Sequence, residues 1–414
     1  MSATAWPEGR DRHERLEDVL RTDGLDLLVA LTPENAEYLA GRNSYIATNW
    51  RIPGIFGVVA GPDGKRAIVD SDSSFDPRNP GPYPVSVYES WLETLDLRDA
   101  RGASIRERAV AQRPHLVARP AQFNLEKITA AVVAAIHRVN EDPRRIGLDL
   151  EHIDVASFHR LKAQLPYIEL VDASQRFYDL RAIKDADEIA KLRLAAELTT
   201  IGIRGAIDAL RLGQSSATVN ANYHIAVNTA VASDPRFAGF RQAEGLATIG
   251  MSTPSAGTVA PGETIRFDMQ VDMSGYHSDI GRTVIHRPTD DQRVVYEVLR
   301  TALFTAQELV KPGVTFAEIF AAGTASMLDA GFTTFSRGHL GHSDGLTQNF
   351  EEAPFIAPGE SRPLVAGMVL SLELPYYLRG TGGFQLERML VVTEDGHETL
   401  DQLPFDLEID LDRS

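Results

Sequence analysis

The sequence contains no cysteine, which excludes disulfide bonds and thiolate metal ligands. It also has no apolar run near the roughly 18 residues that a membrane-spanning helix needs. The N-terminal stretch MSATAWPEGRDRHERLEDVL lacks the hydrophobic segment of a secretory signal peptide. We therefore expect a cytoplasmic protein with no membrane partner.

A surplus of basic residues is missing as well. Lys and Arg number 41 against 58 Asp and Glu, which gives a formal net charge of −17. Nucleic acids and anionic membranes bind clustered Lys and Arg, so this balance argues against both as partners. No low-complexity tract and no repeat at solenoid spacing is present either.

The length of 414 residues, with 43% hydrophobic residues, predicts a compact protein of two domains. In residues 1–175, short apolar runs alternate with helical patterns. Residues 26–31 predict a buried strand, residues 33–41 a helix that ends at a glycine, and residues 55–70 a hairpin around Pro-Asp-Gly. This alternation predicts a small α/β domain.

Residues 176–414 have a different pattern. They begin with a long, charged and then apolar helical segment and continue with strand-like stretches. One helical segment, 291–310, interrupts those strands. We expect an α+β domain with acidic residues concentrated on its strands.

The stretch DMQVDMSGYHSD (268–279) places three aspartates in a sequence that otherwise favours a strand, although Asp is depleted from strands. If the chain turns at Ser274 and Gly275, Asp268 and Asp279 lie roughly opposite each other on one face of a hairpin. Two facing carboxylates repel each other, and a divalent cation removes that repulsion. Asp272, four residues along the strand from Asp268, is too far away for the same metal centre and is expected to flank the turn.

A second pair has the same form. Glu373 in LSLELP and Glu387 in FQLERM lie on predicted strands among apolar residues, and the Gly-rich segment GHLGHSDGL contains His342. A single Asp or Glu is usually a surface residue, but four on strands beside such a histidine form a rare combination. Four carboxylates and an imidazole, without cysteine, suit two divalent cations such as Mn, Fe, Co or Zn.

These segments resemble the motifs of a known family. FDMQVDMSGYHSDIGRT is similar to D-x-G...G-Y-x-S-D-x-T-R-T, GHSDGL to G-H-x-x-G-L, GMVLSLELPYY to G-M-V-x-x-x-E-P-x-x-Y, and GGFQLERMLVVTEDG to G-x-R-I-E-D-x-V-L-V-T-x-x-G. These are motifs of the pita-bread metalloenzymes, which include prolidase, aminopeptidase P and methionine aminopeptidase. The segment LRAIKDADEIAKLRLAAELT also resembles the linker that follows a creatinase-type N-terminal domain.

The resemblance implies an α+β fold, with a creatinase-like α/β domain at 1–175 and a pita-bread catalytic domain at 176–414. It implies a homodimeric, binuclear metal-dependent hydrolase that cleaves a C–N bond of a small molecule or dipeptide. By position, one metal would be held by Asp279, His342, Glu373 and Glu387, and the other by Asp268, Asp279 and Glu387. Glu373 would also carry a proton during catalysis.

The sequence departs from the family at two histidines that contact the substrate in the peptidases. About seventeen residues before Asp268 stands Met251, and seven residues after His342 stands Asn349. In their place, His339 and Asn349 are candidate catalytic residues and Gln270 is a candidate substrate contact. For His339 and Gln270, a surface position or a contact that supports a metal ligand is the simpler interpretation. Two alternatives stay open: a metal-dependent lyase acting on a small zwitterion, like the dimethylsulfoniopropionate lyases, and a non-catalytic binding protein.

The segment 41–54 falls where, in creatinase-type dimers, the N-terminal domain of one subunit borders the active site of the other. There Arg51 could bind a substrate carboxylate through two hydrogen bonds, with Trp50 and Tyr45 as apolar walls. An exposed loop arginine is an equally good interpretation of Arg51.

Overall fold

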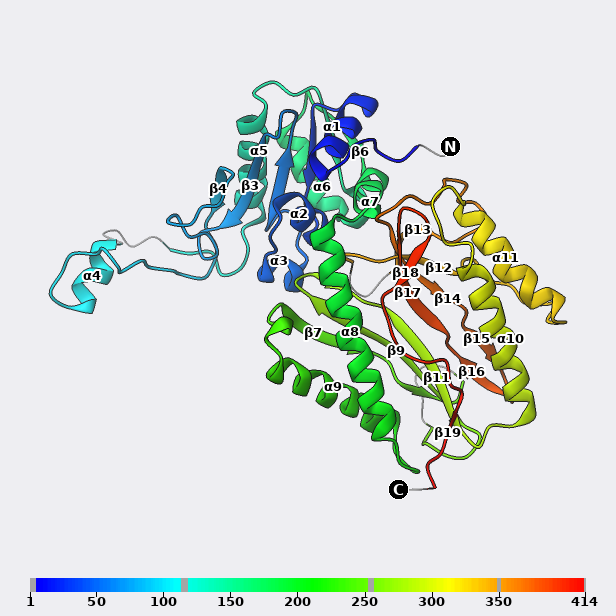
Figure 1. Ribbon diagram of the computed structural model, residues 1–414. Coiled ribbons are helices and arrows are strands. Elements are labelled where there is room, and N and C mark those ends of the chain that lie inside the picture. Colours follow the sequence, from blue (N-terminus) through cyan, green and yellow to red (C-terminus); the bar gives the residue numbers. More distant parts are fainter. Residues whose placement is uncertain (1–4, 113–117, 252–256, 348–350, 413–414) are drawn as a thin grey trace. The chain divides into compact units, whose positions relative to one another are not determined.

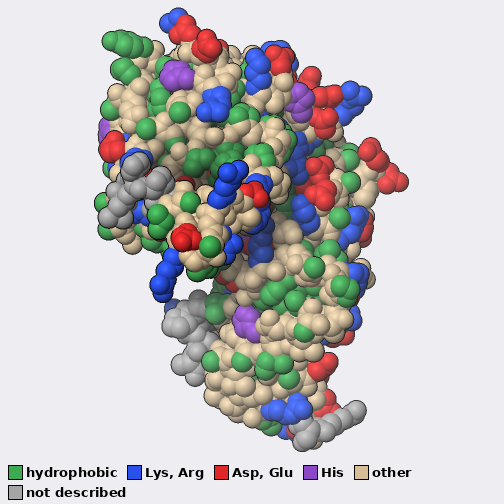
Figure 2. All heavy atoms as spheres, turned by 90° about the vertical axis from the view of Figure 1, so that its left-hand side faces the viewer, with side chains coloured by type: hydrophobic (Ala, Val, Ile, Leu, Met, Phe, Trp, Pro, Cys, Tyr) green, Lys and Arg blue, Asp and Glu red, His purple; other side chains and the backbone are tan. Residues whose placement is uncertain are grey.

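The structure is a computed structural model that describes residues 5–112, 118–251, 257–347 and 351–412. The chain divides into two compact units, Pro7–Phe177 and a second unit that combines Tyr178–Ser414 with Met1–Trp6 (Figure 1). Among the described residues, no helix has both the length and the hydrophobicity needed to cross a bilayer. On the face drawn in Figure 2, Lys and Arg side chains are interspersed with Asp and Glu.

The first unit is built on one mixed sheet of six strands in the order β4-β3-β2-β1-β5-β6. Strand β2 pairs antiparallel with β1 and with β3, and the other neighbours are parallel. The strands are β1 (Leu27–Ala30), β2 (Gly57–Ala60), β3 (Arg66–Ser71), β4 (Val85–Tyr88), β5 (Arg145–Leu148) and β6 (Glu169–Asp172). Its helices are α1 (Arg12–Asp23), α2 (Pro33–Ala40), α3 (Tyr45–Trp50), α4 (Ile105–Gln112), α5 (Leu125–Val139), the 3-10 helix η1 (Leu150–His152) and α6 (Val155–Gln164). Helix α7 (Ser174–Ala182) begins in this unit and ends in the second.

The local predictions for this unit are confirmed. Helix α2 ends at Gly41, which adopts the left-handed conformation with φ 70°, and β2 and β3 form the expected hairpin. Helix α5 packs on β2, β3 and β4. Its apolar face supplies buried residues such as Ile128 and Val132 because apolar residues recur there at the helical period.

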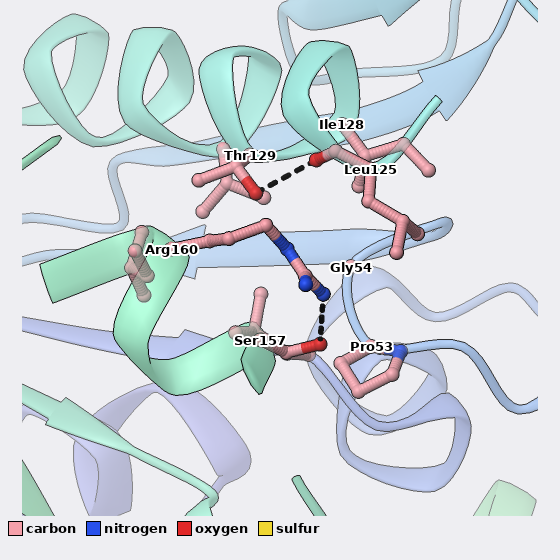
Figure 3. A pocket seen from close by; sticks show the side chains of 10 residues that line it. Pro53, Gly54, Leu125, Ile128, Thr129, Ser157 and Arg160 are labelled. Atoms are coloured by element: carbon pink, nitrogen blue, oxygen red, sulfur yellow. Dashed lines mark hydrogen bonds between the residues drawn. The ribbon is translucent and has the colours of Figure 1, made fainter. Parts of the chain in front are cut away.

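A small pocket lies between α5, α6 and the loop after α3 (Figure 3). It is lined mainly by apolar side chains, and its polar groups bond to one another or to backbone: Arg160 Nη2 donates to Ser157 Oγ at 2.7 Å, and Thr129 Oγ1 donates to the Leu125 carbonyl at 2.8 Å. The lining includes no carboxylate and no histidine. The chemistry expected of a metal-dependent enzyme therefore has to come from other residues.

The second unit contains two larger sheets and a two-stranded ribbon. One sheet has the order β10-β9-β11-β19, with β7 and β8 also paired to β9; the other has the order β13-β12-β14-β17-β18; β15 and β16 form the ribbon. The strands are β7 (Phe240–Gly245), β8 (Thr248–Ile249), β9 (Thr264–Met273), β10 (Tyr276–His277), β11 (Ile280–His286), β12 (Gly341–Ser343), β13 (Glu352–Phe355), β14 (Val369–Glu373), β15 (Tyr376–Leu378), β16 (Gly382–Phe384), β17 (Glu387–Val392), β18 (His397–Thr399) and β19 (Glu408–Ile409).

Helices cover the two sheets from outside (Figure 1). Helix α8 packs on β9 and against α9, while α10 packs on β14 and against α11. The helices are α8 (Ala186–Asp208), α9 (Ser216–Ser233), the 3-10 helix η2 (Pro235–Phe237), α10 (Asp290–Gln307) and α11 (Phe316–Asp329). The expectation of a single helix after the first strands is wrong, because α11 follows α10 and packs against it.

A hydrophobic core fills the space between α10, α11 and the β14–β17 pair. It includes Leu299, Leu303, Phe316, Leu370 and Leu390, all fully buried. Strand β11 of the first sheet lies beside β17 of the second. The adjacent strand ends of the two sheets therefore bring residues distant in sequence into one place.

Candidate metal centre

The hairpin of β9 and β11 carries Asp268 and Asp279. As predicted, the chain turns at Ser274 and Gly275, which both have positive φ (56° and 92°), the backbone conformation that a two-residue hairpin turn needs. The predicted pairing of the two aspartates is shifted, however. Asp268 pairs with Gly281, and Asp279 falls across from Gln270, because the two-residue turn fixes the register along the whole hairpin.

Asp268 and Asp279 are consequently diagonal neighbours on one face. Gln270 Nε2 donates to Asp279 Oδ2 at 2.9 Å, so the residue expected as a substrate contact orients a predicted metal ligand. The other oxygen, Asp279 Oδ1, is buried and accepts no hydrogen bond from the described residues. A buried carboxylate oxygen without a donor is costly unless a cation binds it.

Glu373 and Glu387 stand directly opposite each other on β14 and β17. Both are buried, and Gln385 Nε2 lies 3.2 Å from Glu373 Oε2 and 3.2 Å from Glu387 Oε2, donating between them. Directly opposed like charges destabilise a sheet. The neutral amide of Gln385 offsets this repulsion only in part, and Glu373 has a further partner in Arg337.

His342 lies in β12 beside β14 and is also buried. Its Nδ1 lies 3.1 Å from the Ser343 carbonyl and 3.5 Å from Asp344 Oδ1. Ser371 Oγ in turn donates to Asp344 Oδ2 at 2.7 Å. Contacts to one ring nitrogen leave the other, Nε2, directed at the carboxylates, 3.9 Å from Asp279 Oδ2.

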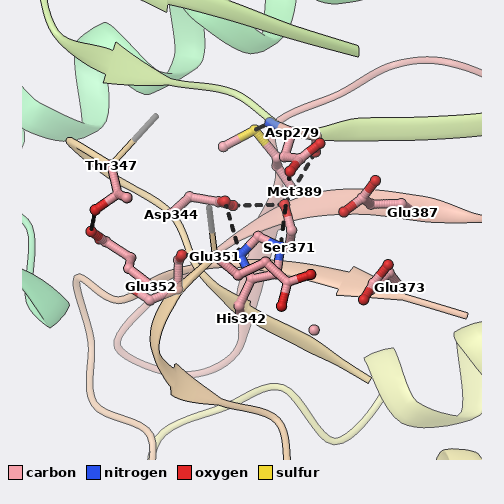
Figure 4. A network of polar contacts seen from close by, with 12 residues as sticks. Asp279, His342, Asp344, Thr347, Glu351, Glu352, Ser371, Glu373, Glu387 and Met389 are labelled. Atoms are coloured by element: carbon pink, nitrogen blue, oxygen red, sulfur yellow. Dashed lines mark hydrogen bonds and ion pairs between the residues drawn. The ribbon is translucent and has the colours of Figure 1, made fainter. Parts of the chain in front are cut away.

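The side chains of the two sheets converge in Figure 4. Ligand atoms of Asp279, His342 and Glu387 all lie within 4.8 Å of one another. A second group with the same spacing is formed by His339, Glu351 and Glu373. Of the five predicted ligands, the structure thus places three in one group and Glu373 in the adjoining one.

Electrostatics connect Asp268 to the same cluster. Burial raises the pKa of Asp268; the charge of Arg266 opposes that rise, and the charge of Glu373 adds to it. The pKa of Asp279 is held well above its usual range by burial and then by the charge of Asp268, and that of Glu387 by burial and then by Asp279. Each carboxylate therefore makes ionisation of the next one more difficult.

His342 responds in the opposite sense. Burial acts to lower the pKa of His342, but the carboxylates of Asp344 and Asp279 outweigh it and raise that pKa to about 9. The cluster as a whole attracts positive charge. Its oxygen-rich donor set, with one imidazole, fits hard or borderline divalent cations, which would bind the buried Asp279 Oδ1 and screen the repulsion.

The group around His339 borders this cluster. His339 Nε2 lies 3.2 Å from Glu351 Oε2, and its Nδ1 lies 3.6 Å from Glu373 Oε1. Arg337 Nη2 donates to the same Glu373 oxygen at 2.8 Å. Because the His339 side chain is 24% exposed, it is open to a substrate as well as in contact with a predicted ligand.

The other predicted site residues lie elsewhere or cannot be placed. Asn349 is outside the described residues. Tyr45, Trp50 and Arg51 lie in or directly after α3 of the first unit. Arg51 Nη1 donates to Glu34 Oε1 at 2.7 Å, so its charge is already balanced within that unit. Tyr45 and Trp50 are 75% and 47% exposed.

Asp272 lies at the turn, where it was expected. Its Oδ1 accepts the Gly275 backbone N–H at 2.6 Å, and burial raises its pKa to about 6. His277 Nε2 lies 3.8 Å from the other Asp272 oxygen, and burial lowers the pKa of His277 to about 3. Both residues support the hairpin instead of contributing to the cluster.

Two residues that differ from the family motifs pack against each other, and the sequence analysis did not identify them. Gln385 stands where the motif G-x-R-I-E has Arg, and Gly281 stands where S-D-x-T-R-T has Thr. A Cβ added at Gly281 would lie 2.4 Å from Gln385 Cγ and 2.9 Å from Glu387 Oε2. The signal for this pair was present in the quoted motifs, but the contact between the two positions is visible only in three dimensions.

Three further residues of the site were also missed: Arg266, Asp344 and Glu351. Asp344 lies two residues after His342, a spacing that gives no hint of its contact with the ring. Glu351 and Glu352 form an acidic pair in the sequence. Glu352 bonds to Thr347 at 2.5 Å and to Arg181 at 2.9 Å, whereas Glu351 faces the cluster (Figure 4).

Family models match most of this chain. Residues 190–394 match the model of metallopeptidase family M24, and residues 12–183 match the creatinase/prolidase N-terminal domain. The Xaa-Pro dipeptidase of Lactobacillus helveticus is 30% identical over 278 residues, which cover 66% of this chain and 75% of that protein. The chain belongs to metallopeptidase family M24.

A second relative agrees. The Xaa-Pro dipeptidase of Lactobacillus delbrueckii subsp. lactis is 30% identical over 282 residues, covering 67% of this chain and 76% of that protein. This member of family M24 is a metal-dependent hydrolase of the peptidase type. These relatives do not favour the lyase or the non-catalytic alternative, and the family implies divalent metal ions.

Solved structures confirm the predicted fold. The prolidase from Thermococcus sibiricus superimposes with a TM-score of 0.75 at 19% identity, over 97% of this chain and 100% of that one. For the prolidase from Pyrococcus horikoshii OT3 the TM-score is 0.74 at 17% identity, over 96% and 99%. The family M24 chain therefore has the expected creatinase-type N-terminal domain followed by a pita-bread domain.

Proposed function

We propose that this protein hydrolyses the C–N bond of a small substrate of the Xaa-Pro dipeptide type, using two divalent cations. The observation that carries the proposal is the convergence of Asp279, His342 and Glu387 from two sheets, with Asp279 Oδ1 buried and without a donor among the described residues. The relatives named Xaa-Pro dipeptidase support the substrate class.

The five residues proposed to hold the cations are Asp268, Asp279, His342, Glu373 and Glu387. When bound, divalent cations polarise a peptide carbonyl and lower the pKa of a water molecule. Candidate ions are Mn, Fe, Co and Zn, because carboxylate-rich sites with one imidazole accept several first-row metals. Asp344 keeps His342 oriented, and Gln270 keeps Asp279 oriented.

Glu373 is proposed to move a proton between the attacking water and the leaving amine. Its Oε1 is fixed by Arg337 at 2.8 Å, and His339 lies next to the same oxygen at 3.6 Å. A carboxylate held in place by such neighbours can hold a proton at one oxygen without rotating away. His339 is proposed to hydrogen-bond the substrate in place of the missing family histidines, and Asn349 stays a predicted contact.

The oligomeric state and the contribution of the first unit also stay predictions. We propose a homodimer in which Tyr45, Trp50 and Arg51 of one subunit border the active site of the other. The exposed rings support this idea, whereas the pairing of Arg51 with Glu34 weakens its role as a carboxylate clamp. Light scattering tests whether the protein is a dimer. The activity of an α3 variant mixed with a metal-site variant tests whether one subunit contributes to the active site of the other. A cytoplasmic location is likewise a prediction.

The metal-dependent reaction is tested with Asp279→Asn. Protein stripped with chelator is reloaded with Mn, Co, Zn or Fe and assayed on Xaa-Pro dipeptides, with metal content measured by mass spectrometry. We expect Asp279→Asn to lose metal and turnover together, because it removes a carboxylate that both proposed metals share. Asp290→Asn makes the same chemical change at a fully exposed side chain and is expected to behave like the wild type.

Two results would contradict the proposal. One is full activity of Asp279→Asn without bound metal. The other is a wild-type protein that binds metal stoichiometrically and cleaves none of the Xaa-Pro dipeptides with any of the four ions.

A further inference from the structure

Arg266 is a buried cation next to the carboxylate cluster. It lies two residues before Asp268 on β9, so both side chains project from the same face of the strand. Only 5% of the residue is exposed. Buried arginines are normally paired with a carboxylate, but within the described part of the chain no carboxylate forms an ion pair with Arg266.

Neutral groups hold the guanidinium instead. Its Nε donates to Thr248 Oγ1 at 3.0 Å, and Thr248 is the residue of β8 that pairs with Arg266 in the sheet. Its Nη1 donates to the hydroxyl of Tyr377 on β15, and the guanidinium carbon lies 5.0 Å from the centre of the Tyr377 ring. The remaining nitrogen, Nη2, donates to no described residue.

Tyr377 keeps a hydrogen-bond donor of its own. Because its oxygen accepts from Arg266, its O–H is free to donate elsewhere. Burial raises the pKa of Tyr377; the charge of Arg266 lowers it, and the charge of Asp268 raises it. The hydroxyl accepts from Arg266, which lies two residues from Asp268 on β9. Arg266 Nη2 and the Tyr377 O–H therefore form two adjacent donors beside the proposed metal ligands.

Two other arginines discussed above, Arg337 and Arg51, already have carboxylate partners. Arg337 bonds to Glu373 at 2.8 Å and Arg51 to Glu34 at 2.7 Å. At the position where the family motif has Arg before the last ligand, this chain has Gln385. Position 385 thus carries no positive charge, whereas position 266, on β9, carries one.

We propose that Arg266 and Tyr377 bind a carboxylate of the substrate and so make this enzyme select a substrate with a free acidic group next to the scissile bond. One carboxylate oxygen takes the Nη2 hydrogen bond and the other takes the Tyr377 hydroxyl, while Thr248 keeps the guanidinium in place. Charge-assisted hydrogen bonds of this kind give both affinity and geometric selection. The substrate assignment rests on the proposed peptidase function, whereas the anion site itself does not.

The test compares a dipeptide with its amide. Metal-loaded full-length protein is assayed on Ala-Pro and on Ala-Pro-amide, which lacks only the carboxylate charge. We expect the wild type to favour the acid, and Arg266→Gln to lower kcat/KM for the acid about 30-fold or more, chiefly through KM. We expect Arg266→Gln to change kcat/KM for the amide by less than about 3-fold, because the neutral amide gains little from the positive charge of Arg266.

Two more variants refine the comparison. Tyr377→Phe keeps the ring and removes the hydroxyl, so we expect a smaller loss that is again confined to the acid. Arg236→Gln removes an exposed arginine that pairs with Glu197 and Asp234, and we expect no change with either substrate. The metal content and melting temperature of each variant show whether a loss of activity reflects misfolding. If Arg266→Gln is misfolded, Arg266→Lys, which keeps the positive charge, is measured instead.

A binding measurement separates the inference from the proposed function. Calorimetry on metal-loaded protein compares proline with prolinamide. Selective loss of proline binding in the Arg266 variants supports the anion site even if the wild type cleaves neither dipeptide, in which case the peptidase proposal fails alone. If the wild type cleaves Ala-Pro and Ala-Pro-amide with equal kcat/KM and binds proline and prolinamide equally, the inference is overturned. An equal loss for acid and amide with reduced metal content overturns it as well, since Arg266 would then only balance the charge of Asp268.

Discussion

Gly281 shows how a single missing side chain makes room for the candidate metal centre. It pairs with Asp268 in the β9–β11 hairpin. The space where its Cβ would lie is occupied by Glu387, the first residue of β17 in the other sheet, and by Gln385, which precedes that strand. The close contact of the two sheets at this point depends on the absence of a Cβ.

Gly281→Ala is therefore expected to displace Glu387. Overpacking of this kind costs about 1–3 kcal/mol in folding free energy, and we expect metal affinity to fall about tenfold or more as Glu387 moves out of position. Metal titration and urea denaturation measure the two effects. Gly359→Ala, where an added Cβ meets nothing within 4 Å, is the matched control. Unchanged metal affinity in Gly281→Ala would show that Glu387 is not a ligand.

Asp344 offers a second prediction at this scale. Its carboxylate contacts Nδ1 of His342 and is itself held by Ser371. Asp344→Asn keeps the shape and removes the charge, so we expect metal affinity to fall about 10–100-fold with little loss of folding stability. Nitrogen chemical shifts of His342 report its tautomer in both proteins. An unaltered tautomer with unaltered affinity would exclude this role for Asp344.

Individual residues of the centre differ in how far the sequence could predict them. Asp279 and Glu387 stand in motifs whose order along the chain survives, so their proximity could be predicted. Arg266 stands between apolar residues on a strand, and a solvent-exposed arginine would show the same pattern, so its burial could not be predicted. Its partners Thr248 and Tyr377 are also distant in the chain. Contacts that depend on side-chain direction across two sheets leave no periodic signal in the sequence.

At the scale of elements, the β9–β11 hairpin determines which residues face each other. Its turn and its strands could be predicted from Ser-Gly and the alternation of apolar residues, but the register was shifted by two residues, which placed Gln270 instead of Asp268 across from Asp279. Helix α11 was missed altogether. Its signal was the capping box from Thr315 to Glu318, in which the Thr315 side chain accepts from the Glu318 N–H.

The turn supports a prediction of its own. Gly275 has a φ of 92°, which side-chain-bearing residues rarely adopt, and its N–H is bound by Asp272. Gly275→Ala is expected to destabilise the fold by about 1–3 kcal/mol, measured by urea denaturation. Because the turn fixes the register, metal affinity should fall too. Gly359→Ala again serves as the control, and a variant as stable as the wild type would contradict the assigned turn conformation.

At the scale of the whole molecule, the buried carboxylates link stability to pH. The pKa values of Asp268, Asp279 and Glu387 are raised in the folded protein, so without metal the folded state binds protons more tightly than the unfolded state. The stability that these protons provide is present at low pH and is lost as pH rises through the raised pKa values. The raised pKa of His342, about 9, acts in the same direction.

Metal-free protein is therefore expected to become less stable as pH rises from about 5 to 8, and the gain in melting temperature on adding metal should grow over the same range. Calorimetry in buffers of different ionisation enthalpy should also detect protons released when metal binds. A metal-induced shift that is the same at both ends of this range would contradict the assignment of these residues as ligands.

The two-sheet origin of the cluster has a mechanical consequence. Asp268 and Asp279 belong to the sheet of β9 and β11, whereas His342, Glu373 and Glu387 belong to the sheet of β12, β14 and β17. Cations bound between them would act as a reversible cross-link joining the two halves of this unit. A chelator would remove that cross-link and leave every covalent bond of the protein intact. Activity would then be lost together with the tight contact between the two sheets.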